Sequence, residues 1–119
     1  RLFVNRMIEE KEGKFIFINS VAGKYGHSFS HSTGYVASKY GLRGFADTLR
    51  TELREYNIKV ISIYPGAIDT SFWDKINVDF PRDEMLSSSD IAETIFHAIT
   101  APNLSVLEDV VVRRTAGDF

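Results

Sequence analysis

The chain has 119 residues, of which 44% are hydrophobic and 25% charged, with a formal net charge of −2 at pH 7 and no cysteine. This is the composition of one globular domain or part of one, with no basic excess to attract nucleic acid or an anionic membrane and no apolar run near the roughly 20 residues that span a bilayer. The lack of cysteine excludes disulfides, thiolate metal sites and a cysteine nucleophile, and it is consistent with a reducing, cytoplasmic location.

Residues 1–11 are predicted to form a helix, and residues 14–20 are predicted to form the first strand. The strand is expected to be short and buried, because the four apolar residues Phe15–Ile18 follow Gly13 and precede a run of small residues. Ser20 then lies at the carboxyl end of a strand. In open α/β sheets the ligand crevice lies outside these ends, so the hydroxyl of Ser20 is placed to meet a substrate oxygen.

A long amphipathic helix is predicted from Ser32 or Thr33 to Leu53, because apolar residues recur with helical period and either hydroxyl residue can cap the start. Tyr35 and Lys39 are four residues apart in its first turns, so their side chains project from the same face. An ammonium group close to a phenol favours the ionised phenol, which makes the tyrosine a usable general acid or base near neutral pH.

Asn57 is expected to end this helix in the left-handed conformation, and residues 58–64 are predicted to form a second strand. Pro65 ends the strand, and Gly66 allows the backbone to approach a bulky group closely. The end of this strand is predicted to face the same crevice as Ser20.

Residues 71–88 are the least regular stretch, and the aromatic pair Phe72–Trp73 at its start either shapes a substrate pocket or packs over the core, with neither favoured. A last helix is predicted to begin with a capping box formed by Ser87 and Asp90. Its apolar face is predicted to belong to the core and consists of Ile91, Ala92, Ile95, Phe96 and Ile99. A third parallel strand at 109–113 completes a small sheet built by right-handed crossovers.

Four segments of the chain match one protein family in combination. They are Asn19–Gly23, Tyr35–Lys39, the helix that continues to Leu53, and the turn Pro65–Thr70. The combination resembles the short-chain dehydrogenases/reductases, which implies an α/β fold with a partial Rossmann-like, doubly wound parallel sheet of about three strands. It also implies that Ser20 orients the substrate oxygen, that Tyr35 is the general acid/base, and that Lys39 activates the tyrosine and holds the nicotinamide ribose. Tyr35 and Lys39 are thereby expected to contact the coenzyme as well as the substrate. The implied activity is NAD(P)-dependent interconversion of an alcohol and a carbonyl.

The resemblance also implies a binding site for NAD or NADP. In this family the turn that starts at Pro65 and Gly66 lies along the nicotinamide, with Ile68 offering backbone groups to the carboxamide and Thr70 a hydroxyl. The family's glycine-rich phosphate-binding turn has no counterpart in this sequence. Residues 1–119 are therefore interpreted as the carboxyl-terminal catalytic half of one Rossmann-like domain whose upstream cofactor-binding half is absent. The isolated chain is expected to be inactive.

A second class of function is open on the same pattern: a non-catalytic fragment or dimerisation module that lacks the cofactor cradle. Without further strands, the edge of the 14–20 strand has unpaired backbone groups. A chain of this length buries only about 60–70% of its unfolded surface, so partners are expected to cover the missing face. In the family resembled, the helix that bears Tyr35 packs against its copy in a second subunit, which implies a homo-oligomer.

Two other chemistries are disfavoured by the pattern. A serine hydrolase would use Ser20 with His27 or His31, but the Gly-x-Ser-x-Gly elbow is not present around Ser20. A metal site made from His27, His31 and Asp69 has no recognised ligand spacing. We therefore expect a small-molecule alcohol or carbonyl substrate, and no metal, nucleic-acid or membrane partner.

Overall fold

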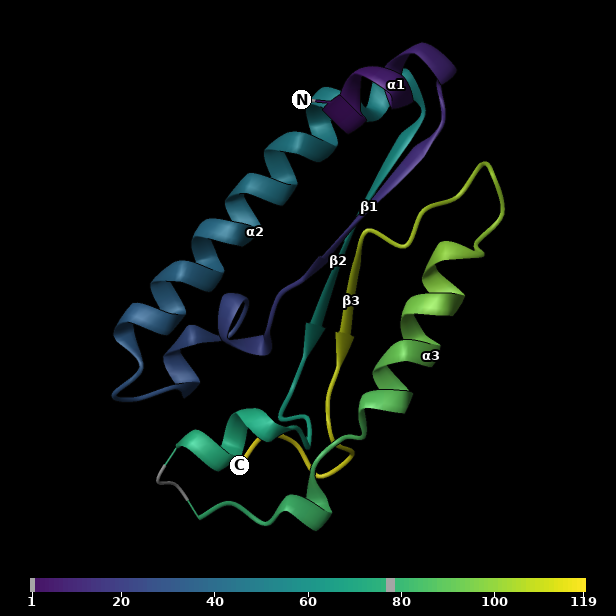
Figure 1. The fold of residues 1–119 in the computed structure, drawn as a ribbon. Coiled ribbons are helices and arrows are strands. Elements are labelled where there is room, and N and C mark those ends of the chain that lie inside the picture. The colour runs from purple at the N-terminus through teal and green to yellow at the C-terminus, as the bar shows by residue number, and fades with distance from the viewer. Residues whose placement is uncertain (1, 77–78) are drawn as a thin grey trace.

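The computed structural model describes residues 2–76 and 79–119 and contains a parallel sheet of three strands with helices on both faces (Figure 1). The elements follow in the order α1 (Leu2–Glu10), β1 (Gly13–Ile18), α2 (Thr33–Leu53), β2 (Ile58–Pro65), α3 (Ser88–Ile99) and β3 (Asp109–Val112). The strands lie in the order β1-β2-β3, so each pair of neighbours is joined by a crossover helix. This arrangement confirms the predicted α/β fold with a partial Rossmann-like sheet.

The central strand, β2, is the most deeply buried element because helices cover both of its faces. Its alternate side chains point to opposite sides of the sheet. Val60 packs with Ala46 and Leu53 of α2, and α1 adds partly buried side chains to this cluster. On the other face, Ile61 packs with Ala98 of α3. The two clusters together form the hydrophobic core.

Strand β1 is shorter and more exposed than predicted. The ladder with β2 ends where the backbone N–H of Asn19 donates to the carbonyl of Ile63 at 2.8 Å, and the chain then enters the 3₁₀ turn Val21–Gly23. Among the described residues no strand pairs with the outer edge of β1, and Ile18 is 48% exposed. The prediction of a buried strand that reaches Ser20 is therefore wrong: β1 is half-buried and ends two residues earlier.

Helix α2 has the predicted extent and begins at Thr33. Ser32 occupies the position before it without forming a side-chain capping bond. After Leu53 the chain continues as one 3₁₀ turn and then reaches Asn57, whose φ of 56° is left-handed as predicted. Tyr35 therefore lies in the first turn of α2, and α2 begins at the end of the molecule toward which the strands run (Figure 1).

Helix α3 begins with the predicted capping box, in which the Ser87 hydroxyl accepts from the Asp90 N–H and the Asp90 carboxylate accepts from the Ser87 N–H. The prediction for its core face is partly wrong, because Ala92 is exposed and Phe96 is 61% exposed, while Ala98 is buried. A residue one position after Ile95 is rotated by about 100° around the helix axis, so it points away from the face that contacts the sheet.

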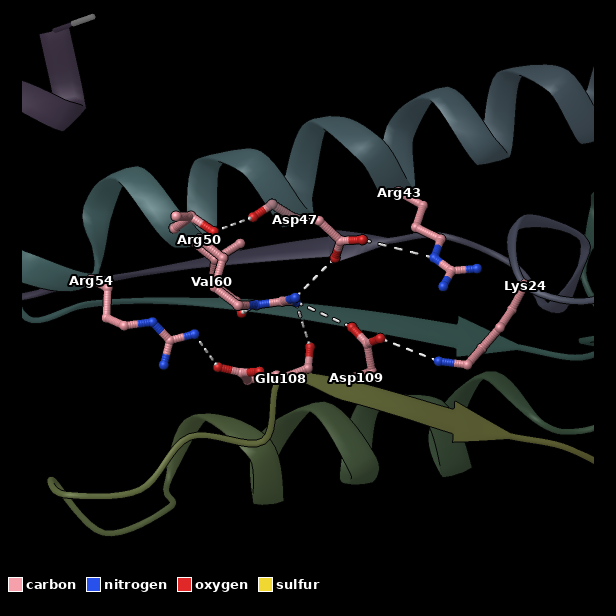
Figure 2. Close-up of polar contacts among 9 residues, drawn as sticks. Lys24, Arg43, Asp47, Arg50, Arg54, Val60, Glu108 and Asp109 are labelled. Carbon is pink, nitrogen blue, oxygen red and sulfur yellow. Dashed lines mark hydrogen bonds and ion pairs between the residues drawn. The ribbon is translucent and has the colours of Figure 1, made fainter.

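Charged side chains join α2 to the beginning of β3 (Figure 2). The first residue of β3 pairs with Ser62, so β3 has no residue opposite Val60. The carbonyl of Val60 accepts a hydrogen bond from Arg50 Nε at 2.9 Å in place of a strand partner. The same guanidinium donates to the carbonyl of Glu108 at 2.9 Å and to the carboxylate of Asp109 at 3.2 Å. Arg50 thus completes the edge of β2 where β3 begins.

Candidate functional site

Three segments that the sequence singles out lie toward the carboxyl end of the sheet. They are the loop after β1, the first turns of α2 and the turn after β2, all at the lower end of the molecule in Figure 1. Parallel strands that end on one side of a sheet bring the loops after them together, which is where open α/β sheets bind ligands.

Tyr35 and Lys39 lie on the same face of α2, as their spacing predicts. The ammonium nitrogen of Lys39 is 5.7 Å from the centroid of the Tyr35 ring, within the range of a cation–π contact. Tyr35 is 45% exposed. Within the described chain neither the phenol nor the ammonium group has a hydrogen-bond partner, so both donors are free to bind another molecule.

Ser20 lies beyond the end of β1 and is almost fully buried. Its hydroxyl accepts a hydrogen bond from the Ala22 N–H at 3.1 Å and so caps the 3₁₀ turn that follows. No hydrogen bond between described residues links this hydroxyl directly to Tyr35 or Lys39. In this capping bond the Ser20 oxygen is the acceptor, so the hydroxyl can still donate its own proton to another group.

One connection between the Ser20 loop and α2 is made by the preceding residue, Asn19, which lies in the matched segment Asn19–Gly23 but for which no role was predicted. Its side-chain oxygen accepts from the Ser20 N–H at 2.8 Å, and its side-chain nitrogen donates to the carbonyl of Lys39 at 3.1 Å. The one sequence signal for this contact is an asparagine at a strand end, four residues before Gly23. A Cβ on Gly23 would lie 2.4 Å from the Asn19 side-chain oxygen, so only glycine fits there.

The turn after β2 contains the residues predicted to contact a coenzyme. Pro65 is the last residue of β2, and the N–H of Gly66 donates to the carbonyl of Val112 at 2.8 Å. A Cβ on Gly66 would meet protein atoms only at 3.5 Å or more, so packing within the described residues does not require glycine there. Ile68 forms a parallel bridge with Leu86, which closes the base of the segment that follows.

Two donors in this turn are free of protein partners in the part of the chain that the structure describes: the backbone N–H of Ile68 and the hydroxyl of Thr70. The carbonyl of Ile68 accepts from the Trp73 indole at 2.7 Å, and that of Thr70 accepts from Arg82 at 3.0 Å. The Arg82 guanidinium also binds Asp69, and this hydrogen bond raises the pKa of Arg82 above its ordinary value. The carbonyls of Ile68 and Thr70 are thus bound by protein donors, while the Ile68 N–H and the Thr70 hydroxyl are not bound by described residues.

Aromatic side chains continue from this turn to the end of the chain. Trp73 contacts Phe72 and Phe80 edge-on, with centroids 5.5 Å apart in each case, and Phe80 stacks on Phe119 at 5.3 Å. Phe72 is 54% exposed and Trp73 half-buried, so the pair packs partly on its own neighbours and partly faces solvent. Residues 77 and 78, which the sequence analysis placed in this loop, lie outside the described residues.

Within residues 2–76 and 79–119, His, Cys, Asp and Glu side chains form no group of three or more that could hold a metal ion. In the same residues, no helix combines the length and the hydropathy that crossing a membrane would need.

Comparison with known proteins agrees with the motifs. The family described as short chain dehydrogenase matches residues 1–80, which is more than half of the chain. Sepiapterin reductase of Chlorobaculum tepidum is 35% identical over 113 residues, and the alignment covers 95% of this chain and 45% of that protein.

Solved structures show the same fold. A betaketoacyl-ACP reductase from Bacteroides thetaiotaomicron has a TM-score of 0.78 at 24% identity, covering 96% of this chain and 46% of that one. ElxO with NADP bound has a TM-score of 0.74 at 20% identity, covering 92% of this chain and 48% of that one. The chain therefore spans less than half the length of each of these three proteins. From the family match, the motifs and the shared fold together, we conclude that the chain belongs to the short-chain dehydrogenase family.

Proposed function

We propose that these residues are the catalytic half of an NAD(P)-dependent oxidoreductase that interconverts an alcohol and a carbonyl. The observation that carries the proposal is the pairing of Tyr35 and Lys39, 5.7 Å from ring centroid to ammonium nitrogen, on the helix turn to which Asn19 ties the Ser20 loop. A free phenol, a free ammonium group and a hydroxyl at the carboxyl end of a parallel sheet suit proton transfer to a substrate oxygen.

Each side chain has a distinct role in this proposal. In the direction of reduction, the phenol of Tyr35 donates its proton to the carbonyl oxygen, and in oxidation the phenolate accepts the proton of the alcohol. Ser20 donates a hydrogen bond to the same oxygen and so holds the substrate in place. Lys39 places a positive charge beside the Tyr35 ring, which stabilises the phenolate formed in each reduction cycle.

The donors of the site fit the nicotinamide end of a dinucleotide. We infer that Lys39 binds the ribose hydroxyls, that the N–H of Ile68 binds the carboxamide oxygen and that the Thr70 hydroxyl binds the adjacent phosphate or amide. The coenzyme, when bound, supplies or accepts the hydride at the substrate carbon. The expected coenzyme is NAD or NADP. ElxO, whose fold is similar to that of this chain, has NADP bound.

The test uses a full-length protein that carries these residues together with a cofactor-binding half. Tyr35→Phe removes one hydroxyl and is expected to lower kcat by about 10²–10⁴-fold, the usual contribution of a general acid. The matched control is Tyr40→Phe on the same helix, whose hydroxyl donates to the Lys24 carbonyl at 3.0 Å and has no part in the chemistry. Reduction of a carbonyl substrate is followed by NADPH and NADH absorbance. Activity retained in Tyr35→Phe would remove the assigned role.

A second candidate, a dimerisation module, is favoured by exposed aromatic residues on the helices of one face. Phe3 of α1 is 79% exposed and Phe45 of α2 is 58% exposed. Sedimentation velocity of the isolated chain tests this candidate: Phe45→Glu is expected to shift an oligomer toward the monomer. Titration of NADPH into the same sample separates the two candidates, because saturable tight binding by the isolated chain would contradict the absence of a cofactor cradle.

A further inference from the structure

Asn19 is a buried polar residue whose side chain forms hydrogen bonds that are separate from those of the sheet. Its backbone already extends the ladder through the bond to the Ile63 carbonyl. The side chain is nevertheless enclosed, with the residue 4% exposed, and both ends of its amide are used, one on the Ser20 N–H and one on the Lys39 carbonyl. Buried polar groups are retained with partners, because leaving one unsatisfied is costly.

The side-chain amide of Asn19 fits beside the helix because its neighbour, residue 23, is a glycine. Gly23 lies against it, and a Cβ at this position would approach both the Asn19 side-chain oxygen, at 2.4 Å, and the Lys39 carbonyl, at 3.0 Å. A side chain at Gly23 would therefore push the strand end and the helix apart. The bond also reaches the backbone of Lys39, so it leaves the ammonium group of that residue free.

We infer that Asn19 is a positioning residue that sets the Ser20 hydroxyl against the helix turn carrying Tyr35 and Lys39; the inference rests on the proposed function. Asn19 joins the Ser20 end of the loop to α2 with two directional bonds, 2.8 Å and 3.1 Å long, while Tyr40 of α2 binds the loop further along, at the Lys24 carbonyl. Removing the Asn19 side chain leaves the capping bond of Ser20 and the Tyr40 contact in place but releases the Ser20 end of the loop from the Lys39 carbonyl. The donor that holds the substrate oxygen then moves relative to the proton donor.

The experiment is a double-mutant cycle in the full-length protein with Asn19→Ala, Ser20→Ala and the pair together. Misplacement of a positioned group by about 1 Å can cost about 10²-fold, so Asn19→Ala is expected to lower kcat by about 10²-fold with KM for the coenzyme unchanged. In the Ser20→Ala background the same substitution is expected to have no further effect on kcat, because Asn19 acts through Ser20. Equal losses in both backgrounds would overturn the inference.

Asn57 provides a matched control at the opposite end of the same helix. Its side-chain nitrogen donates to the Lys11 carbonyl at 3.2 Å, so it also joins α2 to the β1 region through an amide-to-carbonyl bond. Asn57→Ala removes that bond and places alanine at a φ of 56°, which strains the backbone. We expect this variant to lower Tm while kcat is retained, which separates loss of stability from loss of position.

A readout that does not depend on turnover is the exchange of the Ser20 amide hydrogen, measured by NMR on the folded protein. In Asn19→Ala the Ser20 N–H is expected to lose protection, while the N–H of residue 19, which bonds to Ile63, keeps it. Protection of Ser20 unchanged in this variant would overturn the inference even if the enzyme is active. Loss of protection in a protein without any NAD(P)-linked turnover would instead contradict the proposed function and leave the bridge established.

Discussion

Two hydroxyl groups are buried in β2 on the side of the sheet that faces α2, those of Ser62 and Tyr64. Neither completes a hydrogen bond within the described residues. The Tyr64 side chain has no exposed surface, and the Lys24 ammonium nitrogen lies 5.1 Å from the centroid of its ring. Burial raises the pKa of the Tyr64 phenol above its ordinary value, the charge of Asp109 adds to the rise, and the Ser62 hydroxyl opposes it. The phenol is therefore held in its neutral form.

Tyr64→Phe is expected to leave the fold intact and to stabilise it by up to about 1 kcal/mol at pH 8, because it removes a buried hydroxyl without a partner. The benefit should grow with pH. An unfolded tyrosine loses its proton near pH 10, before the folded Tyr64 does, so the unfolded state is favoured as pH rises above about 10. Urea unfolding at pH 8 and at pH 10.5 measures the difference between variant and parent. A difference that is the same at both values would contradict the raised pKa.

At the scale of elements, one side chain of α2 binds both β2 and the beginning of β3. Arg50 is only 11% exposed at its side chain and binds the carbonyls of Val60 and Glu108 as well as two carboxylates (Figure 2). Asp109, the first residue of β3, also pairs with Lys24 from the loop after Ser20 at 3.2 Å. The charges thus connect α2, β2, β3 and the site loop in one network.

Arg50→Ala is expected to lower the free energy of unfolding by about 2–3 kcal/mol, because the buried carbonyl of Val60 loses its donor and two carboxylates lose a cation. The carbonyl of Glu108 also loses one bond but keeps the one from the Ser62 N–H. Arg54→Ala is the matched control in the 3₁₀ turn that follows α2: its guanidinium pairs with Glu108 at 2.7 Å, but the side chain is 64% exposed. An exposed pair of this kind contributes about 0–1 kcal/mol. Denaturant titration compares the two variants with the parent. If the two variants lose the same free energy of unfolding, the burial of Arg50 does not determine its contribution to stability.

The elements that could be predicted from the sequence are those with local signals. Helix α2 has an apolar stripe and a left-handed Asn57 at its end, and α3 has a capping box at Ser87, so both were placed correctly. The bond from Asn19 to the Lys39 carbonyl could not be predicted, because it joins the end of β1 to a residue 20 positions later. The exposure of Phe96 could not be predicted either, because a broad apolar stripe on a helix does not determine which of its residues contact the sheet.

At the scale of the whole molecule, the end of the chain returns to the site region (Figure 1). Arg114 pairs with Glu84, and its guanidinium carbon lies 3.8 Å from the centroid of the Phe119 ring. Phe119 in turn stacks on Phe80. The spacing of Tyr35 and Lys39 predicted their proximity, but no local pattern predicts the contacts of Arg114 with Glu84 and of Phe119 with Phe80, because these two join residues at least 30 positions apart. Residues 113–119 thereby hold the segment after β2.

Trp73 is the only tryptophan of the chain and reports on this contact, because its ring touches Phe80, which stacks on Phe119. Phe119→Ala removes the outer ring of the cluster, so the fluorescence of Trp73 is expected to shift to longer wavelength and to become more accessible to acrylamide. The far-UV circular dichroism should not change, because no helix or strand loses a contact in its core. Phe3→Ala removes an exposed ring from α1 and is expected to leave the Trp73 emission unchanged. If the Phe119→Ala spectrum also stays unchanged, the end of the chain does not hold this segment, and the loop next to the site is ordered by its own contacts alone.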